Sequence, residues 1–257
     1  MDNRHFNALT RSLAASLTRR RGLGVVASAS LPLLGMAQPA IAGKKQKKVT
    51  LCLNGQTVKK PKKKAKKLQK QGASEGSCRC GNGGACFAFV TEAGFTGSSF
   101  SSIAGADASC QEAASDAGLP GTYKAWLSAG GSTPVTRFTN TANAGPYVLV
   151  GSGINSGGPK QGALVANSFA ELLACSNGTC QANPISVTEK GELSPQRPVW
   201  TGTRSDGTAA TDTCNGWNSD AALGLVGDTN LVNSQWTDNG TRACDEPRPV
   251  FCFQQAT

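Results

Sequence analysis

The chain has 257 residues, enough for one domain of ordinary size with additional segments. Its net charge of +10 is unevenly distributed: residues 44–78 hold twelve lysines against one glutamate, whereas residues 79–257 hold nine Lys and Arg against fourteen Asp and Glu. The basic character therefore belongs to one short tract. The only histidine, His5, lies near the N-terminus, which excludes Ser–His–Asp and Cys–His nucleophilic machinery and His-ligated zinc from the rest of the chain.

Residues 1–42 are predicted to be an export signal. Three arginines at 19–21 precede a weakly apolar stretch, and small residues at 40–42 suit a signal peptidase. The segment resembles a twin-arginine signal cleaved after Ala42, although Gly22 stands where that family has a large apolar residue. The alternative is an uncleaved anchor. No other stretch has the ~20 apolar residues that cross a bilayer.

Residues 43–78 are predicted to form a small basic module. The stretch 49–60 indicates a hairpin around Asn54–Gly55, and 62–72 indicates one or two helical turns. The module resembles small Cys-framed modules that precede larger domains in secreted bacterial proteins. Its charge favours binding of polyanions such as nucleic acid, acidic polysaccharide, cell-wall polymer or anionic lipid, without reading a nucleic-acid sequence. Alternatively, it is a solvated spacer. The predicted polyanion-binding residues are Lys59, Lys60, Lys62, Lys63, Lys64, Lys66, Lys67 and Lys70.

A glycine-rich joint is predicted at 79–85, within the sequence CRCGNGGAC. The chain carries ten cysteines, an even number that, with an export signal, favours disulfides formed in an oxidising compartment. Four of them, Cys52, Cys78, Cys80 and Cys86, permit three pairings. We favour Cys52–Cys78 with Cys80–Cys86, and the other two pairings stay open.

The main domain is predicted to span residues 86–257. It begins with a strand, CFAFVT, followed by a helix over 101–118. The helix has one apolar stripe that includes Cys110, and Gly118 is placed to end it. The stretch 121–128, GTYKAWLS, alternates as a strand should, with Trp126 on the face opposite its other apolar residues.

The later elements are less regular. Strands are predicted at 146–153 and 197–208, and a short helix is predicted from Ser168. Cys175 and Cys180 are five residues apart around an Asn–Gly pair, so they are expected to close a local loop.

The segments GADASCQEAASDAGLPGTYKAWLS, RPVWTGTRSDG and WTDNGTRACDEPRPVFCFQQ resemble, in order, segments of endostatin. The chain resembles bacterial endostatin-like domains of unknown function, within the C-type-lectin-like superfamily. The resemblance covers about residues 86–257. It implies an α+β fold with a mixed twisted sheet, two helices and long loops. It also implies two nested disulfides, Cys110–Cys252 and Cys214–Cys244, which staple the last strand to the early helix and to the long-loop region.

The ligand sites of these relatives do not carry over. Sugar-binding C-type lectins hold Ca²⁺ with an Asn–Asp pair after a Trp, but the Asn is missing before Asp238, and Glu246 lies on the wrong side of Cys244. The zinc-binding histidines and the polyanion-binding arginines of endostatin do not carry over either, because the chain after its leader has no histidine and the main domain is net acidic. Asp245 and Glu246 are adjacent and would point to opposite faces of a strand, so they could not flank one bond. The four tryptophans are expected in the core and not along a sugar-binding groove.

We therefore expect an exported bacterial protein that binds and does not catalyse, with no metal ion or other cofactor. The expected ligand is an extracellular protein or glycan, with attachment to an anionic polymer or lipid surface through the lysine tract. The alternatives are a calcium-dependent lectin and an extracellular hydrolase that uses carboxylates.

Overall fold

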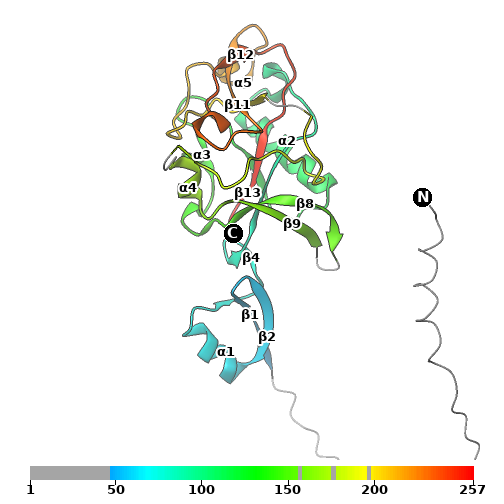
Figure 1. The fold of residues 1–257 in the computed structure, drawn as a ribbon, viewed down its shortest axis with the longest axis vertical. Helices are drawn as coiled ribbons and strands as arrows, with labels where there is room; N and C mark the ends of the chain where they lie inside the picture. Colours follow the sequence, from blue (N-terminus) through cyan, green and yellow to red (C-terminus); the bar gives the residue numbers. More distant parts are fainter. Residues whose placement is uncertain (1–46, 156–157, 175–177, 196–197) are drawn as a thin grey trace, which may run out of the picture. The chain divides into compact units, whose positions relative to one another are not determined.

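The computed structural model describes residues 47–155, 158–174, 178–195 and 198–257 (Figure 1). The predicted export signal and its cleavage site lie outside these residues. The described residues form a single compact unit. Within the described ranges, no helix is both long enough and apolar enough to cross a bilayer.

The protein is a mixed α+β structure with few helices. The strands are β1 (Lys48–Leu53), β2 (Gln56–Pro61), β3 (Ser74–Glu75), β4 (Arg79–Cys80), β5 (Gly83–Gly84), β6 (Cys86–Val90), β7 (Tyr123–Ala125), β8 (Tyr147–Asn155), β9 (Gly158–Ala166), β10 (Pro198–Trp200), β11 (Leu223–Asp228), β12 (Thr241–Ala243) and β13 (Phe251–Gln254). The helices are α1 (Lys62–Gln69), α2 (Ile103–Asp116), α3 (Pro134–Arg137), α4 (Phe169–Leu173) and α5 (Cys214–Trp217), with 3₁₀ turns η1 (Gly97–Phe100), η2 (Thr141–Asn143) and η3 (Ser234–Trp236).

The main domain is built on a twisted five-stranded sheet in the order β7-β13-β6-β8-β9. The last strand, β13, lies antiparallel between β7 and β6, and β6 runs parallel to β8. Side chains of a strand alternate between its two faces, and both faces of this sheet are buried. In β6, for example, Phe87 and Phe89 enter one core cluster, whereas Ala88 and Val90 enter the other. This explains why β6, CFAFV, is apolar throughout and does not alternate with polar residues.

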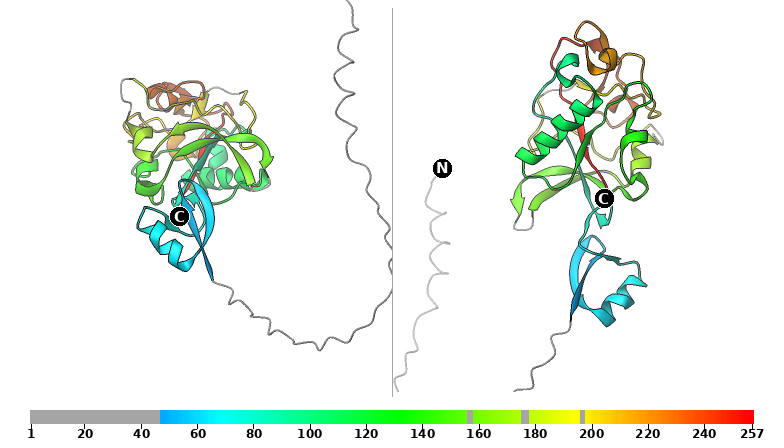
Figure 2. Two further views of the ribbon diagram at one scale, coloured as in Figure 1. Left: turned by 60° about the horizontal axis from the view of Figure 1, so that its bottom comes forward. Right: turned by 180° about the vertical axis from the view of Figure 1, so that it is seen from behind.

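Helix α2 covers one face of this sheet, as the rear view in Figure 2 shows. Ser102 caps its first turn by accepting a hydrogen bond from the backbone N–H of Gly105, and Gly118 follows its last turn with a φ of +67°. The buried positions Ala106, Cys110 and Ala114 form the expected stripe. A disulfide joins Cys110 to Cys252 of β13, so the helix is covalently attached to the middle of the sheet.

The opposite face of the sheet is covered by α3, α4 and long connections. Phe169 and Leu172 of α4 pack there with Trp126, which lies on the face opposite Tyr123, as its sequence predicts. The expected second helix is thus only the five-residue α4, because the chain turns away after Leu173. A second sheet, β10-β11-β12, carries the long loops.

Two predicted strands are shorter than expected. The stretch 121–128 is extended only at β7, and 197–208 only at β10. Beyond Trp200 the chain turns toward a buried hydroxyl network, in which the Thr201 hydroxyl donates to the Thr237 carbonyl at 2.6 Å. Hydrogen bonds from side chains replace a regular ladder there.

A left-handed turn at α5 follows the predicted bend. Cys214, Asn215, Gly216 and Trp217 have φ values of 50°, 54°, 71° and 66°. This backbone costs about 1–2 kcal/mol for each residue other than glycine. The Cys214–Cys244 disulfide and the bond from Trp217 Nε1 to the Ser128 carbonyl, 2.9 Å long, hold the turn in place.

Residues 47–78 fold as the hairpin and helix that the sequence predicts. Strands β1 and β2 pair around Asn54–Gly55, and both turn residues have positive φ. Leu51 of β1 and Ala65 of α1 are fully buried in a small core. The disulfide Cys52–Cys78 connects β1 to the end of the module.

The glycine-rich joint is closely packed. A Cβ on Gly84 would stand 2.5 Å from the backbone nitrogen of Arg79, and one on Gly81 would stand 2.8 Å from Ala256. These glycines let the backbone approach its neighbours closely. The Cys80–Cys86 disulfide closes the segment, so it is a fixed connection and not a loose linker.

Four of the five expected disulfide pairs are therefore present. Cys180 is disulfide-bonded as well, but its expected partner, Cys175, lies outside the described residues.

Candidate polyanion-binding surface and adjoining pocket

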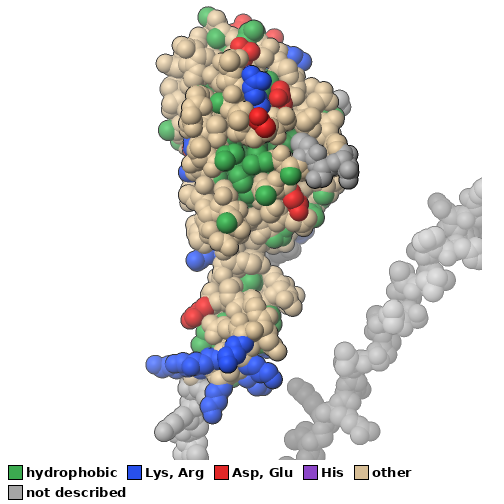
Figure 3. All heavy atoms as spheres, turned by 90° about the vertical axis from the view of Figure 1, so that its left-hand side faces the viewer, with side chains coloured by type: hydrophobic (Ala, Val, Ile, Leu, Met, Phe, Trp, Pro, Cys, Tyr) green, Lys and Arg blue, Asp and Glu red, His purple; other side chains and the backbone are tan. Residues whose placement is uncertain are grey.

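Seven of the eight predicted lysines lie on β2 and α1, and the eighth, Lys70, directly follows α1. The side of α1 that carries Ala65 and Leu68 packs in the small core with residues of β1 and β2. The lysines of α1 lie on its other sides and are exposed. On the face shown in Figure 3, Lys and Arg side chains gather over the module and are few on the main domain. Lys60 differs from the others: it is half-buried, since it lies on the same strand face as Val58.

The lysine cluster has no balancing acids. Within residues 47–78, no lysine forms an ion pair, and the one glutamate, Glu75, accepts its hydrogen bond from Gln69. Lys62 and Lys66 stand one helical turn apart, as do Lys63 and Lys67. Such like-charged pairs destabilise a helix by about 0.2–0.5 kcal/mol each. The first turn of α1 also holds no acidic residue, although the helix dipole favours negative charge there.

Four lysines border a shallow hollow of about 390 Å³ beside the start of α1. Its lining residues are Lys47, Lys62, Lys63 and Lys66. Pro61, at the N-cap, provides no capping side chain, so this end of the helix has only the positive ends of backbone dipoles and ammonium groups. The arrangement suits an extended anion with several charges.

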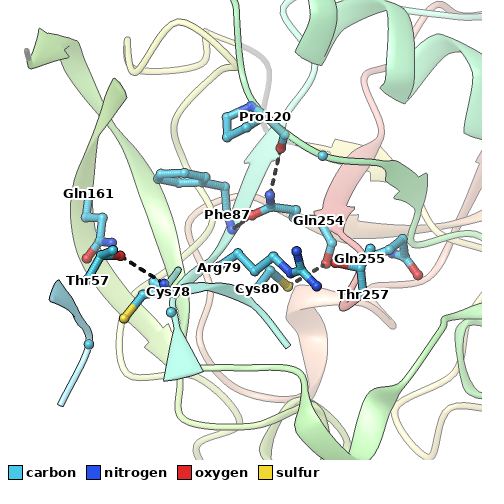
Figure 4. A pocket seen from close by; sticks show the side chains of 14 residues that line it. Thr57, Cys78, Arg79, Cys80, Phe87, Pro120, Gln161, Gln254, Gln255 and Thr257 are labelled. Carbon is cyan, nitrogen blue, oxygen red and sulfur yellow. Dashed lines mark hydrogen bonds between the residues drawn. The ribbon is translucent and has the colours of Figure 1, made fainter. Parts of the chain in front are cut away.

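A second hollow, of about 410 Å³, lies where the module meets the main domain. The hairpin contributes Thr57, the joint contributes Arg79, and the main sheet contributes Phe87, Gln161 and Gln254 (Figure 4). Gln254 is 6 % exposed and fully engaged: its Oε1 accepts from the Phe87 N–H at 3.0 Å, and its Nε2 donates to the Pro120 carbonyl at 2.7 Å. Sequence reasoning did not find this pocket, since its residues are far apart in the chain.

A third hollow, of about 320 Å³, lies between α2 and the segment after β6. Glu92, Glu112, Asp116 and Glu189 line it, and Lys190 forms an ion pair with Glu92. Burial raises the pKa of Glu189, although backbone N–H groups partly oppose that shift. Among the described residues, no group of three or more His, Cys, Asp or Glu is arranged to hold a metal ion.

The carboxylates considered from the sequence lie apart from these hollows. Asp238 is half-buried and accepts a long bond, 3.4 Å, from the Ser205 backbone N–H. Asp245 and Glu246 lie outside any described strand, because β12 ends at Ala243 and both acids lie exposed in the segment that follows it. Glu246 forms an ion pair there with Arg248.

All four tryptophans are buried, as expected. Trp126, Trp200 and Trp217 are 0 % exposed and Trp236 is 1 % exposed. Trp126 Nε1 donates to the Thr237 hydroxyl at 2.8 Å. None of these rings is available to floor a sugar-binding groove.

Asp107 and Arg137 form a largely buried ion pair that the sequence did not reveal. Arg137 Nη1 donates to both carboxylate oxygens of Asp107, at 2.8 and 2.7 Å, and Nη2 donates to the carbonyls of Ala125 and Leu127. The pair fixes β7 against α2 and α3. Both terminal nitrogens of the guanidinium are engaged with the carboxylate or with backbone, and only the buried Nε has no hydrogen-bond partner among the described residues, so we read the pair as structural.

The chain was compared with models of known protein families and with curated proteins, and neither comparison finds a match.

Proposed function

We propose that this is an exported, non-catalytic binding protein that attaches to polyanions through the lysines of its N-terminal module. The main domain is proposed to be C-type-lectin-like, of the endostatin-like kind, and to display a surface for an extracellular protein or glycan. The observation that carries the attachment is the lysine cluster, which has no acidic partner within the described part of the module.

The folded state of the module favours binding over a spacer role. A spacer needs only solvated charge and no fixed structure. Here a disulfide, Cys52–Cys78, and a small core around Leu51 hold the lysines in fixed positions despite their mutual repulsion. Lysines that repel one another destabilise the helix on which they lie, and such a local cost is expected where function requires the residues.

Two features support the proposed kind of main domain. The first strand, β6, pairs with the last, β13, and a disulfide joins the early helix to that last strand. A second disulfide, Cys214–Cys244, lies in the long-loop region. Both pairings are those that the endostatin-like resemblance implies.

The test measures binding of the full chain to random-sequence duplex DNA, used as a polyanion of known charge density, by fluorescence anisotropy over roughly 50–200 mM NaCl. A triple variant replaces Lys62, Lys63 and Lys66 with Gln. We expect the slope of log Kobs against log salt to become shallower by about 2.7, which is 0.9 for each lost phosphate contact.

The matched control removes three positive charges from the main domain, by changing Lys160, Arg204 and Arg242 to Gln. All three side chains are exposed, so the net charge falls equally. The control should keep the original slope, with or without EDTA. Equal slopes for the two triple variants would show that only net charge matters and would refute attachment through the module.

A further inference from the structure

The pocket beside the joint has side chains of two kinds. The first kind forms its wall: Gln254 and Gln255 are buried, and their amides are hydrogen-bonded within the protein. The second kind has polar groups that make no hydrogen bond or ion pair within the described part of the protein. In the described part of the chain, no hydrogen bond or ion pair engages the guanidinium of Arg79 or the side-chain amide of Gln161, and both residues are exposed.

Thr57 adds a third free donor. Its Oγ1 accepts a hydrogen bond from the Cys78 backbone N–H at 2.9 Å, which leaves the hydroxyl proton available. Thr57, Arg79 and Gln161 come from β2, β4 and β9, and all three line the same hollow (Figure 4). In Figure 4, Thr57 and Gln161 lie on one side of the hollow, whereas the Arg79 side chain extends away from them toward Gln255 and Thr257. A ligand that spans the hollow would therefore meet an amide and a hydroxyl at one end and a guanidinium at the other.

The charge of the lining selects the kind of ligand. No aspartate or glutamate lines the hollow, and Arg79 is its only charged side chain. Among the side chains of the lining, a cation would find no charged partner, whereas a carboxylate matches the planar fork of a guanidinium. Thr257 also lines the hollow beside Arg79, so a ligand carboxylate has to approach the guanidinium next to that residue. Phe87, Ala85 and Pro120 supply an apolar wall, and the amide and hydroxyl suit the hydroxyl groups of a sugar. The volume, about 410 Å³, lies within the range of small-molecule sites.

The position of Arg79 is fixed before any ligand arrives. The disulfides Cys52–Cys78 and Cys80–Cys86 flank it directly in the chain. Gly84 packs so closely on the Arg79 backbone that a Cβ would stand 2.5 Å from its nitrogen. A backbone held in this way lowers the entropy lost on binding.

The pocket also continues toward the lysine cluster. Thr57 and Lys59 are two residues apart in β2, so their side chains lie on the same face, about 7 Å from each other along the strand. A linear anion that leaves the pocket along β2 would pass over Lys59 toward α1. The ligand is therefore expected to be a polymer of acidic units and not an isolated acid.

We propose that this pocket binds one carboxylate-bearing sugar unit of an acidic polysaccharide, with the carboxylate on Arg79 and the sugar hydroxyls on Thr57 and Gln161. The neighbouring units lie over the lysines of the module. This inference rests on the proposed attachment to polyanions and adds a selective subsite to it.

The test uses isothermal titration of the full chain with trigalacturonate, at low salt. Arg79→Gln should weaken binding roughly 10- to 100-fold, since a charge-assisted bidentate contact is lost. Arg79→Lys keeps the charge but not the fork, and should lose most of the same affinity. Arg242→Gln removes an equal charge from an exposed site on β12 and should bind normally. Tryptophan fluorescence checks that each variant is folded.

Binding of the same variants to duplex DNA distinguishes a failure of this inference from a failure of the proposed function. Arg79→Gln should bind DNA within about twofold of the unchanged chain, because the lysines carry that contact. If Arg79→Gln and Arg242→Gln bind trigalacturonate equally well, the pocket is not the subsite, although attachment through the lysines stands. An equal loss toward DNA and trigalacturonate would make Arg79 part of the general basic surface and would overturn the subsite. Failure of the unchanged chain to bind DNA would refute the proposed function itself.

Discussion

Removal of the Cys110–Cys252 disulfide should cost more free energy of unfolding than removal of any other described disulfide. The two cysteines are 142 residues apart, whereas Cys80 and Cys86 are six apart. In the chain-entropy model, a cross-link restricts the unfolded chain more when it closes a longer loop. The two separations correspond to about 5 kcal/mol and about 2 kcal/mol.

The matched variants are the double replacements Cys110→Ala with Cys252→Ala, and Cys80→Ala with Cys86→Ala. All four cysteines are at most 3 % exposed, so the packing lost is similar in both variants. The difference of about 3 kcal/mol should therefore come from loop length. Urea unfolding without reductant, followed by the fluorescence of the buried tryptophans, measures it. The long-loop variant should also show a larger m-value, because its unfolded chain expands further. Equal losses in the two variants would refute the loop-length argument.

Three further changes test the interior of the main domain. Arg137→Ala should cost about 3–5 kcal/mol in urea unfolding, because it leaves the Asp107 carboxylate buried without its partner; a loss below about 1 kcal/mol would mean that water replaces the guanidinium. Thr237→Val should cost about 1–3 kcal/mol, because Trp126 Nε1 loses its acceptor; an unchanged urea midpoint would contradict this. Burial raises the pKa of Glu189, so the folded state holds that proton to higher pH than the unfolded chain does. Stability should then rise as the pH falls through the interval between the two pKa values, and Glu189→Gln should flatten that part of the stability–pH curve; identical curves for both proteins would count against it.

The sequence predicted the elements whose signals are local. The Asn54–Gly55 turn, the stripe around Cys110 and the all-apolar strand β6 each follow from periodicity or turn chemistry, and the structure contains them. The cysteine pairs came from spacing and from the endostatin-like resemblance. The lysine cluster was visible as composition, and the structure adds which lysines share the hollow beside α1.

Features that depend on distant contacts could not be predicted in this way. The pocket brings Thr57, Arg79 and Gln161 together from three separate segments, and no local pattern marks any of them. The ion pair of Asp107 and Arg137 spans 30 residues for the same reason.

The place where the main domain begins and ends has a consequence for engineering. Strand β6 starts beside the finish of β13, since Ala88 pairs with Phe253, and the Thr257 N–H reaches the Cys80 carbonyl at 3.4 Å. A domain whose two extremities meet can be spliced into a surface loop of a host protein, or circularly permuted, without stretching its core. A cassette that starts at Cys80, so that the Cys80–Cys86 disulfide is kept, should thus tolerate transplantation, with the cut ends rejoined by a short peptide.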